Sequence, residues 1–96
     1  MSWRVTLRPA PQADLRDARD WYDQRREELG NEFLLAATDA MLSLEEAPHV
    51  RQIYYRDFRR ALMDRFPYKI FYRIEGGQVI VHRVLHAALD HPRELD

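Results

Sequence analysis

Residues 59–86, with the sequence RRALMDRFPYKIFYRIEGGQVIVHRVLH, decide the fold. In the second half of this stretch, apolar and polar residues alternate on both sides of Gly76 and Gly77. Two glycines between alternating runs favour the tight turn of a β-hairpin, because glycine adopts positive φ angles without steric cost. The run at residues 60–66 predicts a further strand. The stretch therefore predicts an antiparallel sheet built around a glycine hairpin.

The expected register of the hairpin pairs Glu75 with Gln78 and divides the side chains between two faces. The predicted core face holds Tyr68, Ile70, Tyr72, Ile74, Val79, Val81, Arg83 and Leu85. The opposite face holds Lys69, Phe71, Arg73, Ile80, His82, Val84 and His86. This second face mixes apolar with basic side chains, which is unusual for a purely solvated surface. We therefore expect it to bind a partner or a substrate.

Before the hairpin, apolar residues recur first at the spacing of a β-strand and then at the spacing of an α-helix. Residues 3–8 predict a half-buried strand that ends at Pro9. Apolar residues at helical spacing then predict a first helix ending at Gly30, and Asn31 is the expected cap of a second helix that runs to Pro48. Residues 53–56 predict one more short strand.

The order of these elements predicts an α+β fold of two layers, β-α-α-β-β-β(-β). It has an N-terminal strand, an antiparallel helical hairpin and a C-terminal antiparallel meander. A chain of 96 residues has room for one hydrophobic core of this kind. We therefore expect residues 1–96 to form a single domain.

Composition limits the function classes. With 46% hydrophobic and 32% charged residues the chain is globular, and without cysteine it has no thiolate chemistry. The first ten residues contain no apolar signal-peptide core, and no apolar run is long enough to span a membrane, which together predict a cytoplasmic protein. Residues 1–50 carry six arginines and ten acidic residues, whereas residues 51–96 carry nine basic and six acidic residues. The basic residues therefore gather in the part that forms the sheet.

The histidines do not form a metal site. His82 and His86 stand roughly 13 Å apart along an extended strand, which is too far for both to bind one metal ion. His49 and His91 are expected at the surface. His86, at the end of the last strand, is expected to hydrogen-bond a loop carbonyl. No metal and no other cofactor is predicted.

Two arginine positions have expected orientations. Arg59 and Arg60 are neighbours in a strand and should therefore point to opposite faces, so at most one of them belongs to any given site. Arg83 is assigned to the core face, where a guanidinium must either reach the edge of the sheet or form an ion pair.

Three stretches, in this order, carry a family resemblance. They are Ala-Asp-Leu at residues 13–15 with Trp21 and Tyr22, Leu-Gly-Asn-Glu-Phe-Leu at residues 29–34, and Arg-Phe-Pro-Tyr-Lys-Ile-Phe-Tyr-Arg at residues 65–73 followed by Val-Leu-His at residues 84–86. Over nearly its whole length the chain resembles the RelE/ParE superfamily, the toxins of bacterial type II toxin–antitoxin modules. The long helical hairpin and the Arg-Phe-Pro-Tyr segment are more similar to the ParE-like branch.

This resemblance implies the toxin of a plasmid-stabilisation module that arrests growth. A ParE-like toxin is expected to act on DNA gyrase by protein–protein interaction and not as an enzyme. It is also expected to form a tight complex with a cognate antitoxin, whose acidic amphipathic segment would cover the mixed sheet face. The expected contact residues for the antitoxin or target are Arg59, Arg60, Lys69, Phe71, Arg73, Ile80, His82, Val84 and His86.

Two alternatives follow from the same resemblance. A RelE-type toxin would be a metal-independent endoribonuclease that cuts mRNA on the ribosome, with His82 or His86 as acid or base and Arg65 and Arg73 at the phosphate. The third hypothesis is an attenuated relative that keeps only antitoxin binding. It arises because residues 87–89 are Ala-Ala-Leu, where many ParE-like sequences carry arginines.

Overall fold

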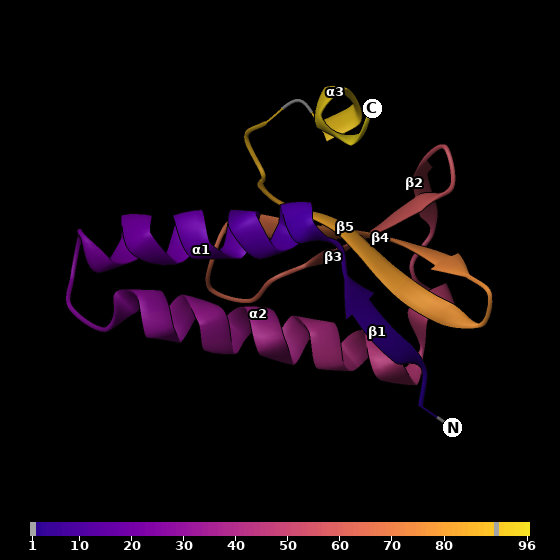
Figure 1. The fold of residues 1–96 in the computed structure, drawn as a ribbon, viewed down its shortest axis with the longest axis horizontal. Coiled ribbons are helices and arrows are strands. Elements are labelled where there is room, and N and C mark those ends of the chain that lie inside the picture. Colours follow the sequence, from indigo (N-terminus) through magenta and orange to yellow (C-terminus); the bar gives the residue numbers. More distant parts are fainter. Residues whose placement is uncertain (1, 90) are drawn as a thin grey trace.

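The computed structural model describes residues 2–89 and 91–96 and shows a five-stranded sheet with helices on both faces (Figure 1). The elements are β1 (Arg4–Leu7), α1 (Pro9–Asp23), α2 (Leu29–Glu46), the 3-10 helix η1 (Pro48–Val50), β2 (Ile53–Tyr55), β3 (Phe58–Leu62), β4 (Tyr68–Glu75), β5 (Gln78–His86) and α3 (His91–Leu95). The strand order is β1-β5-β4-β3-β2, with β1 parallel to β5 and the other pairs antiparallel. The predicted α+β class, with its N-terminal strand, helical hairpin and strand meander, is confirmed.

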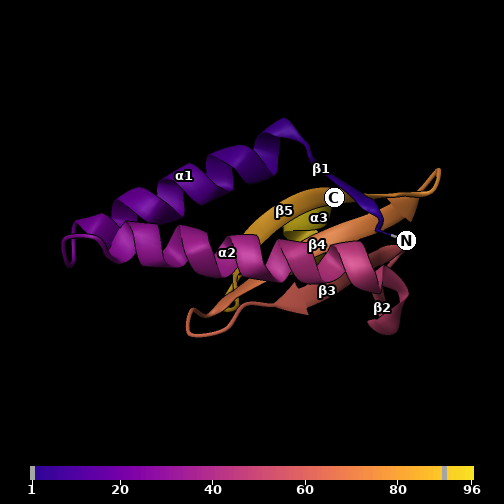
Figure 2. The same ribbon diagram turned by 90° about the horizontal axis from the view of Figure 1, so that it is seen from below.

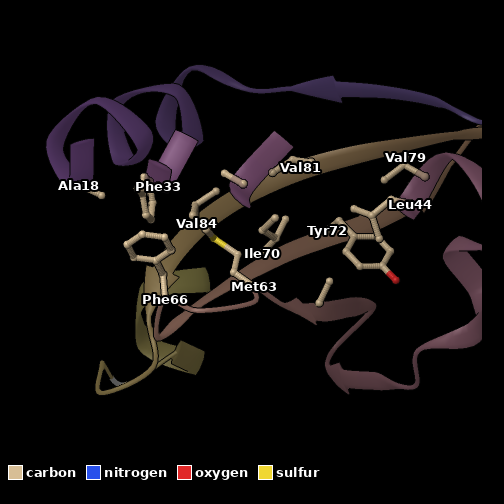
Figure 3. Packing of buried hydrophobic residues seen from close by; sticks show 12 residues of the cluster. Ala18, Phe33, Leu44, Met63, Phe66, Ile70, Tyr72, Val79, Val81 and Val84 are labelled. Atoms are coloured by element: carbon tan, nitrogen blue, oxygen red, sulfur yellow. The ribbon is translucent and has the colours of Figure 1, made fainter. Parts of the chain in front are cut away.

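The main core lies between the helical hairpin and one face of the sheet. α1 and α2 run side by side along this face (Figure 1 and Figure 2). Phe33 and Leu44 of α2 join Ile70 and Tyr72 of β4 in the core, and all four are 0% exposed (Figure 3). The hydroxyl of Tyr72 donates a hydrogen bond of 2.7 Å to the carbonyl oxygen of Pro48. The buried phenol is therefore satisfied and also fixes the turn after α2.

A β-bulge in β5 places the residues after it on the opposite sheet faces from those that the sequence predicted. Tyr72 pairs with Val81, but the next residue of β4, Phe71, pairs with Arg83. His82 is thus an extra residue in β5, and one extra residue reverses the alternation beyond it. The predicted faces were wrong for four residues: Val84 and His86 lie on the helix side, and Arg83 and Leu85 lie on the opposite side.

Gly30 does not end a helix, as the sequence had indicated, but lies in the first turn of the second one. α1 already ends at Asp23, and Glu28, with φ of 69°, turns the chain into α2. The amide of Gly30 donates to Oδ1 of Asp23 at 2.7 Å, and a Cβ atom on Gly30 would lie only 2.6 Å from the carbonyl oxygen of Arg19. Glycine is required here because the two helices approach closely, and not because the helix stops.

No sequence pattern predicted α3 (His91–Leu95). This five-residue helix lies on the side of the sheet away from α1 and α2 (Figure 2). His91, its first residue, was expected at the surface but is only 4% exposed. Pro92 at the second helical position suits a helix start, but five residues are too few to show a helical period.

Candidate binding surfaces

The open face, defined as the sheet face away from α1 and α2, collects most of the predicted contact residues. Residues paired across antiparallel strands share a face, so the partners of Phe71 and its neighbours can be assigned from the register. Phe58 and Tyr54 also contact this face, against His82 and Phe71 respectively. The predicted residues that lie on the open face are Arg60, Lys69, Phe71, Arg73, Ile80 and His82.

Three predicted contact residues lie elsewhere. The guanidinium of Arg59 donates to the carbonyl oxygen of Arg51 and holds the segment after η1, on the helix side of the sheet. Val84 is 2% exposed and belongs to the main core. His86 packs edge-on against Tyr68, with ring centroids 5.2 Å apart. Arg59 and Arg60 point to opposite faces as expected, whereas the positions of Val84 and His86 follow from the bulge.

One end of the open face is polar and centred on the bulge residue, His82. Nε2 of His82 lies 3.5 Å from Nη1 of Arg8, and its ring lies 4.8 Å from that of Phe58. Burial, and then the positive charges of Arg8 and Arg73, lower the pKa of His82 below its usual value. The imidazole is therefore neutral at neutral pH. Arg73 is itself paired with Glu75 at 3.3 Å.

The centre of the open face is covered by α3. The ring of His91 packs on Phe71 and Tyr54, with centroids 4.8 Å and 6.4 Å away. Its Nε2 donates to the carbonyl oxygen of His86 at 2.9 Å. The ring of His86 itself accepts a bond of 3.0 Å at Nδ1 from the amide of Ala88, so the prediction that this ring bonds a loop carbonyl was wrong. The part of this face available to a partner is therefore smaller than the alternation of the hairpin predicted.

The uncovered corner lies over β3 and the start of β4. Arg60 stacks on Tyr54, with the guanidinium carbon 3.9 Å from the ring centroid. Leu62 is 70% exposed and pairs with Lys69 across the two strands. Within residues 2–89 and 91–96, neither Arg60 nor Lys69 has a carboxylate within ion-pair distance. This corner combines positive charge with an exposed apolar side chain, and its role as a binding face stays a prediction.

An apolar groove that the sequence did not reveal lies between α1 and the end of β5. Its volume is about 430 Å³. Trp21 and Leu89 are 48% and 46% exposed along it, which is high for side chains of this size. The remaining lining includes Ala18, Tyr22, Tyr68, Val84 and His86. The groove also takes in Arg83 and Leu85, so it follows the end of β5 and includes side chains from both faces of this strand.

A partly buried ion pair forms the polar wall of the groove. The carboxylate of Asp14 accepts hydrogen bonds from Nε and Nη2 of Arg83 at 2.8 Å and 2.9 Å, and from the amide of Val84 at 3.0 Å. These bonds raise the pKa of Arg83 further above its usual value. The expectation that Arg83 is ion-paired is confirmed. The pair also ties α1 to β5 at the position of the bulge.

The four nuclease candidates do not converge. His82 and Arg73 lie on the open face, and His86 lies in the groove on the other side of the sheet. Arg65 is in the turn between β3 and β4, where its guanidinium donates to Glu32 at 2.7 Å. Acid–base catalysis of RNA cleavage requires the proton-transfer groups and the phosphate-binding cations around one phosphate. These four side chains cannot meet that requirement together.

Among residues 2–89 and 91–96, no group of three or more histidine, cysteine or acidic side chains is arranged to hold a metal ion. None of the helices that the structure describes is long and apolar enough to cross a membrane.

Comparison with known proteins places this architecture among bacterial toxin–antitoxin components. A solved structure described as "Chromosomal ParDE TA system from P. aeruginosa" has the same fold, with a TM-score of 0.68. The match covers 88% of this chain and 96% of that chain at 18% sequence identity. The family model described as "ParE toxin of type II toxin-antitoxin system, parDE" matches residues 5–90, and the chain belongs to this ParE toxin family. No curated protein matches the chain.

Proposed function

We propose that the chain acts in the cytoplasm on DNA gyrase by protein–protein interaction, and that a cognate antitoxin holds it in a tight complex until then. Membership of the ParE toxin family supports this function. The observation that carries the choice of target is the separation of His82 and His86 onto opposite sides of the sheet. A protein with this arrangement acts by contact more readily than by cutting RNA.

Two surfaces are suited to the antitoxin. The apolar groove, with Trp21 and Leu89 exposed along it, would accept apolar side chains of an amphipathic segment. The uncovered corner of the open face, with Arg60 and Lys69, would attract acidic side chains of the same segment. A segment that contacts both must pass around the edge of the sheet, so truncating it should weaken binding in two steps.

The proposed antitoxin groove explains why the tail carries Ala-Ala-Leu at residues 87–89. Leu89 contributes an apolar wall to the groove, which an arginine at the same position would not do. The departure from the arginines of many ParE-like sequences therefore alters the groove and leaves the open face unchanged. The apolar groove therefore supports retained antitoxin binding. Toxicity is tested by the experiment below.

The test is induction of the chain in bacteria that lack the antitoxin, with pulse labelling of DNA and protein synthesis in parallel. We expect DNA synthesis to fall first and a DNA-damage response to follow. In addition, the triple variant His82→Ala, His86→Ala, Arg73→Ala should leave mRNA intact, as the unsubstituted chain does. An early fall in protein synthesis that the triple variant abolishes would instead establish the mRNA endonuclease.

Two controls make the result interpretable. Melting temperatures of the variant and the unsubstituted chain must agree within a few degrees, since loss of folding removes either activity. Coexpression of the neighbouring small gene should restore growth and raise the melting temperature of the purified complex. If neither DNA nor protein synthesis falls, the chain is an attenuated relative and the gyrase proposal is wrong.

A further inference from the structure

The outer face of α2 carries two exposed leucines. Leu35 is 67% exposed and Leu42 is 50% exposed, whereas Phe33, Ala37 and Leu44 of the same helix are buried. Seven residues are close to two helical turns, so Leu35 and Leu42 lie on one side of α2. In Figure 2, α2 passes in front of the sheet and no other labelled element lies over it. This side of α2 therefore presents an apolar row to the solvent, where a helix that contacts only the core would present polar side chains.

A second groove adjoins this apolar row. It lies between α2 and the end of β3 and has a volume of about 370 Å³. Its apolar lining comes from Leu35, Ala36 and Ala40 of α2 and from Leu62 of β3, which is 70% exposed. The small side chains of Ala36 and Ala40 allow another helix to approach closely. The row and the groove together form the kind of surface on which an amphipathic helix lays its apolar face.

Carboxylates follow the leucines at the same spacing. Glu32, Asp39 and Glu46 recur every seven residues, so they form a second row along α2 next to the first. Glu32 is already neutralised, because Arg65 and Arg26 lie 2.7 Å and 3.1 Å from its carboxylate oxygens. Within residues 2–89 and 91–96, no arginine, lysine or histidine lies within ion-pair distance of Asp39 or Glu46. These two carboxylates are therefore available to a cationic partner.

The exposed charge of the groove has the same negative sign. Besides the pair of Glu32 and Arg65, the charged residues that line it are Asp39, Asp64 and Arg51. Asp64 is exposed, whereas Arg51 is half-buried. Two copies of the chain that met through this surface would bring two acidic rows together, and such like-charge contacts are unfavourable. The surface is thus suited to a basic partner and not to a second copy.

We propose that the outer face of α2 and the groove beside it bind a basic amphipathic helix of another protein. The spacing on α2 defines the partner's chemistry: apolar side chains every seven residues pack between Leu35 and Leu42, and lysine or arginine at the same period pairs with Asp39 and Glu46. This surface shares no residue with the lining of the groove between α1 and β5. The inference goes beyond the proposed function, because it assigns a further partner that binds apart from the surfaces suited to the antitoxin.

The test measures binding of a fluorescent synthetic helix to the full chain by anisotropy. The probe spans about three heptads, with leucine and lysine each recurring every seven residues, and a second probe has glutamate in place of lysine. The unsubstituted chain should bind the lysine probe and not the glutamate probe. The variant Leu35→Gln, Leu42→Gln should bind the lysine probe about tenfold more weakly, because the apolar contacts are lost. The variant Asp39→Asn, Glu46→Gln should bind it roughly threefold to tenfold more weakly and with less dependence on salt.

A matched control separates this surface from net charge. The variant Asp20→Asn, Glu27→Gln removes two negative charges at exposed positions that do not line the groove, and its affinity for the lysine probe should stay within about twofold of the unsubstituted chain. All substituted side chains are exposed, so the three variants keep their fold.

Four results would overturn the proposal. They are no binding of the lysine probe, equal binding of both probes, unchanged affinity of either α2 variant, and a loss in the control as large as that in Asp39→Asn, Glu46→Gln. Sedimentation of the free chain should show a monomer. A dimer that Leu35→Gln, Leu42→Gln dissociates would mean that a second copy covers this face, which also contradicts the proposal.

Discussion

Replacing Phe33 by alanine should give the largest loss of stability of the substitutions considered. Its ring is 0% exposed and contacts three other rings, those of Tyr22, Phe66 and Tyr68, at centroid distances of 5.4, 5.4 and 5.0 Å. Removing a buried aromatic ring lowers the free energy of unfolding by about 3–5 kcal/mol, because the cavity that it leaves closes only in part. Since small domains are stable by roughly 5–15 kcal/mol, this loss is a large share of the free energy of unfolding.

The measurement is urea denaturation of the Phe33→Ala chain followed by circular dichroism. Leu35→Ala is the matched control, because Leu35 is on the same helix two residues away and is 67% exposed. Its free energy of unfolding should stay within about 0.5 kcal/mol of the unsubstituted chain. A loss for Phe33→Ala of less than about 1 kcal/mol would mean that the helical hairpin does not pack on the sheet as described.

Replacing Asp14 by asparagine should give the second largest effect. Its carboxylate accepts two bonds from Arg83 and one from the amide of Val84, and Asp14 is only 14% exposed. The amide of asparagine is nearly isosteric, but it leaves the guanidinium without its main counter-charge. Breaking a fully buried pair costs about 3–5 kcal/mol. Because Arg83 is 27% exposed and retains Glu94, we expect a loss of about 2 kcal/mol.

A double-mutant cycle tests the assignment of this loss to the ion pair. In the background Arg83→Met, the change Asp14→Asn should cost less than about 1 kcal/mol, because the charge that it would leave unpaired is gone. Asp17→Asn, at an exposed position of the same helix that also lines the groove, should be nearly neutral. Additive losses in the cycle would show that Asp14 and Arg83 stabilise the protein independently.

The sequence predicted the fold where local chemistry determines it. Gly76 and Gly77 have φ of 58° and 77°, and Glu75 pairs with Gln78, as a two-residue glycine turn requires. Gly30 shows the limit of the same reasoning. Glycine is typical of a helix end, which is why the sequence predicted one at this position. The structure requires glycine for another reason, the close contact of α2 with the backbone of Arg19, eleven residues earlier. That contact depends on how the two helices pack.

The candidate surfaces were predictable only in part, for a related reason. The mixed character of the open face follows from strand alternation, and the positions of Arg60, Lys69 and Arg73 were predicted by it. A bulge has no local signature in the residues around His82, so the four residues beyond it, 83–86, were assigned to the wrong face. The apolar groove depends on α1 meeting the end of β5, which is distant in sequence, and no periodicity reveals such a meeting.

Cleavage of plasmid DNA by purified gyrase tests the proposed target most directly. The chain, freed of antitoxin, is incubated with gyrase, ATP and plasmid, and in parallel with ribosomes that carry mRNA. We predict that linear DNA accumulates with gyrase and that the mRNA stays intact. Cleaved mRNA together with unchanged gyrase activity would contradict the account and would require catalytic groups other than His82 and His86 acting in one site.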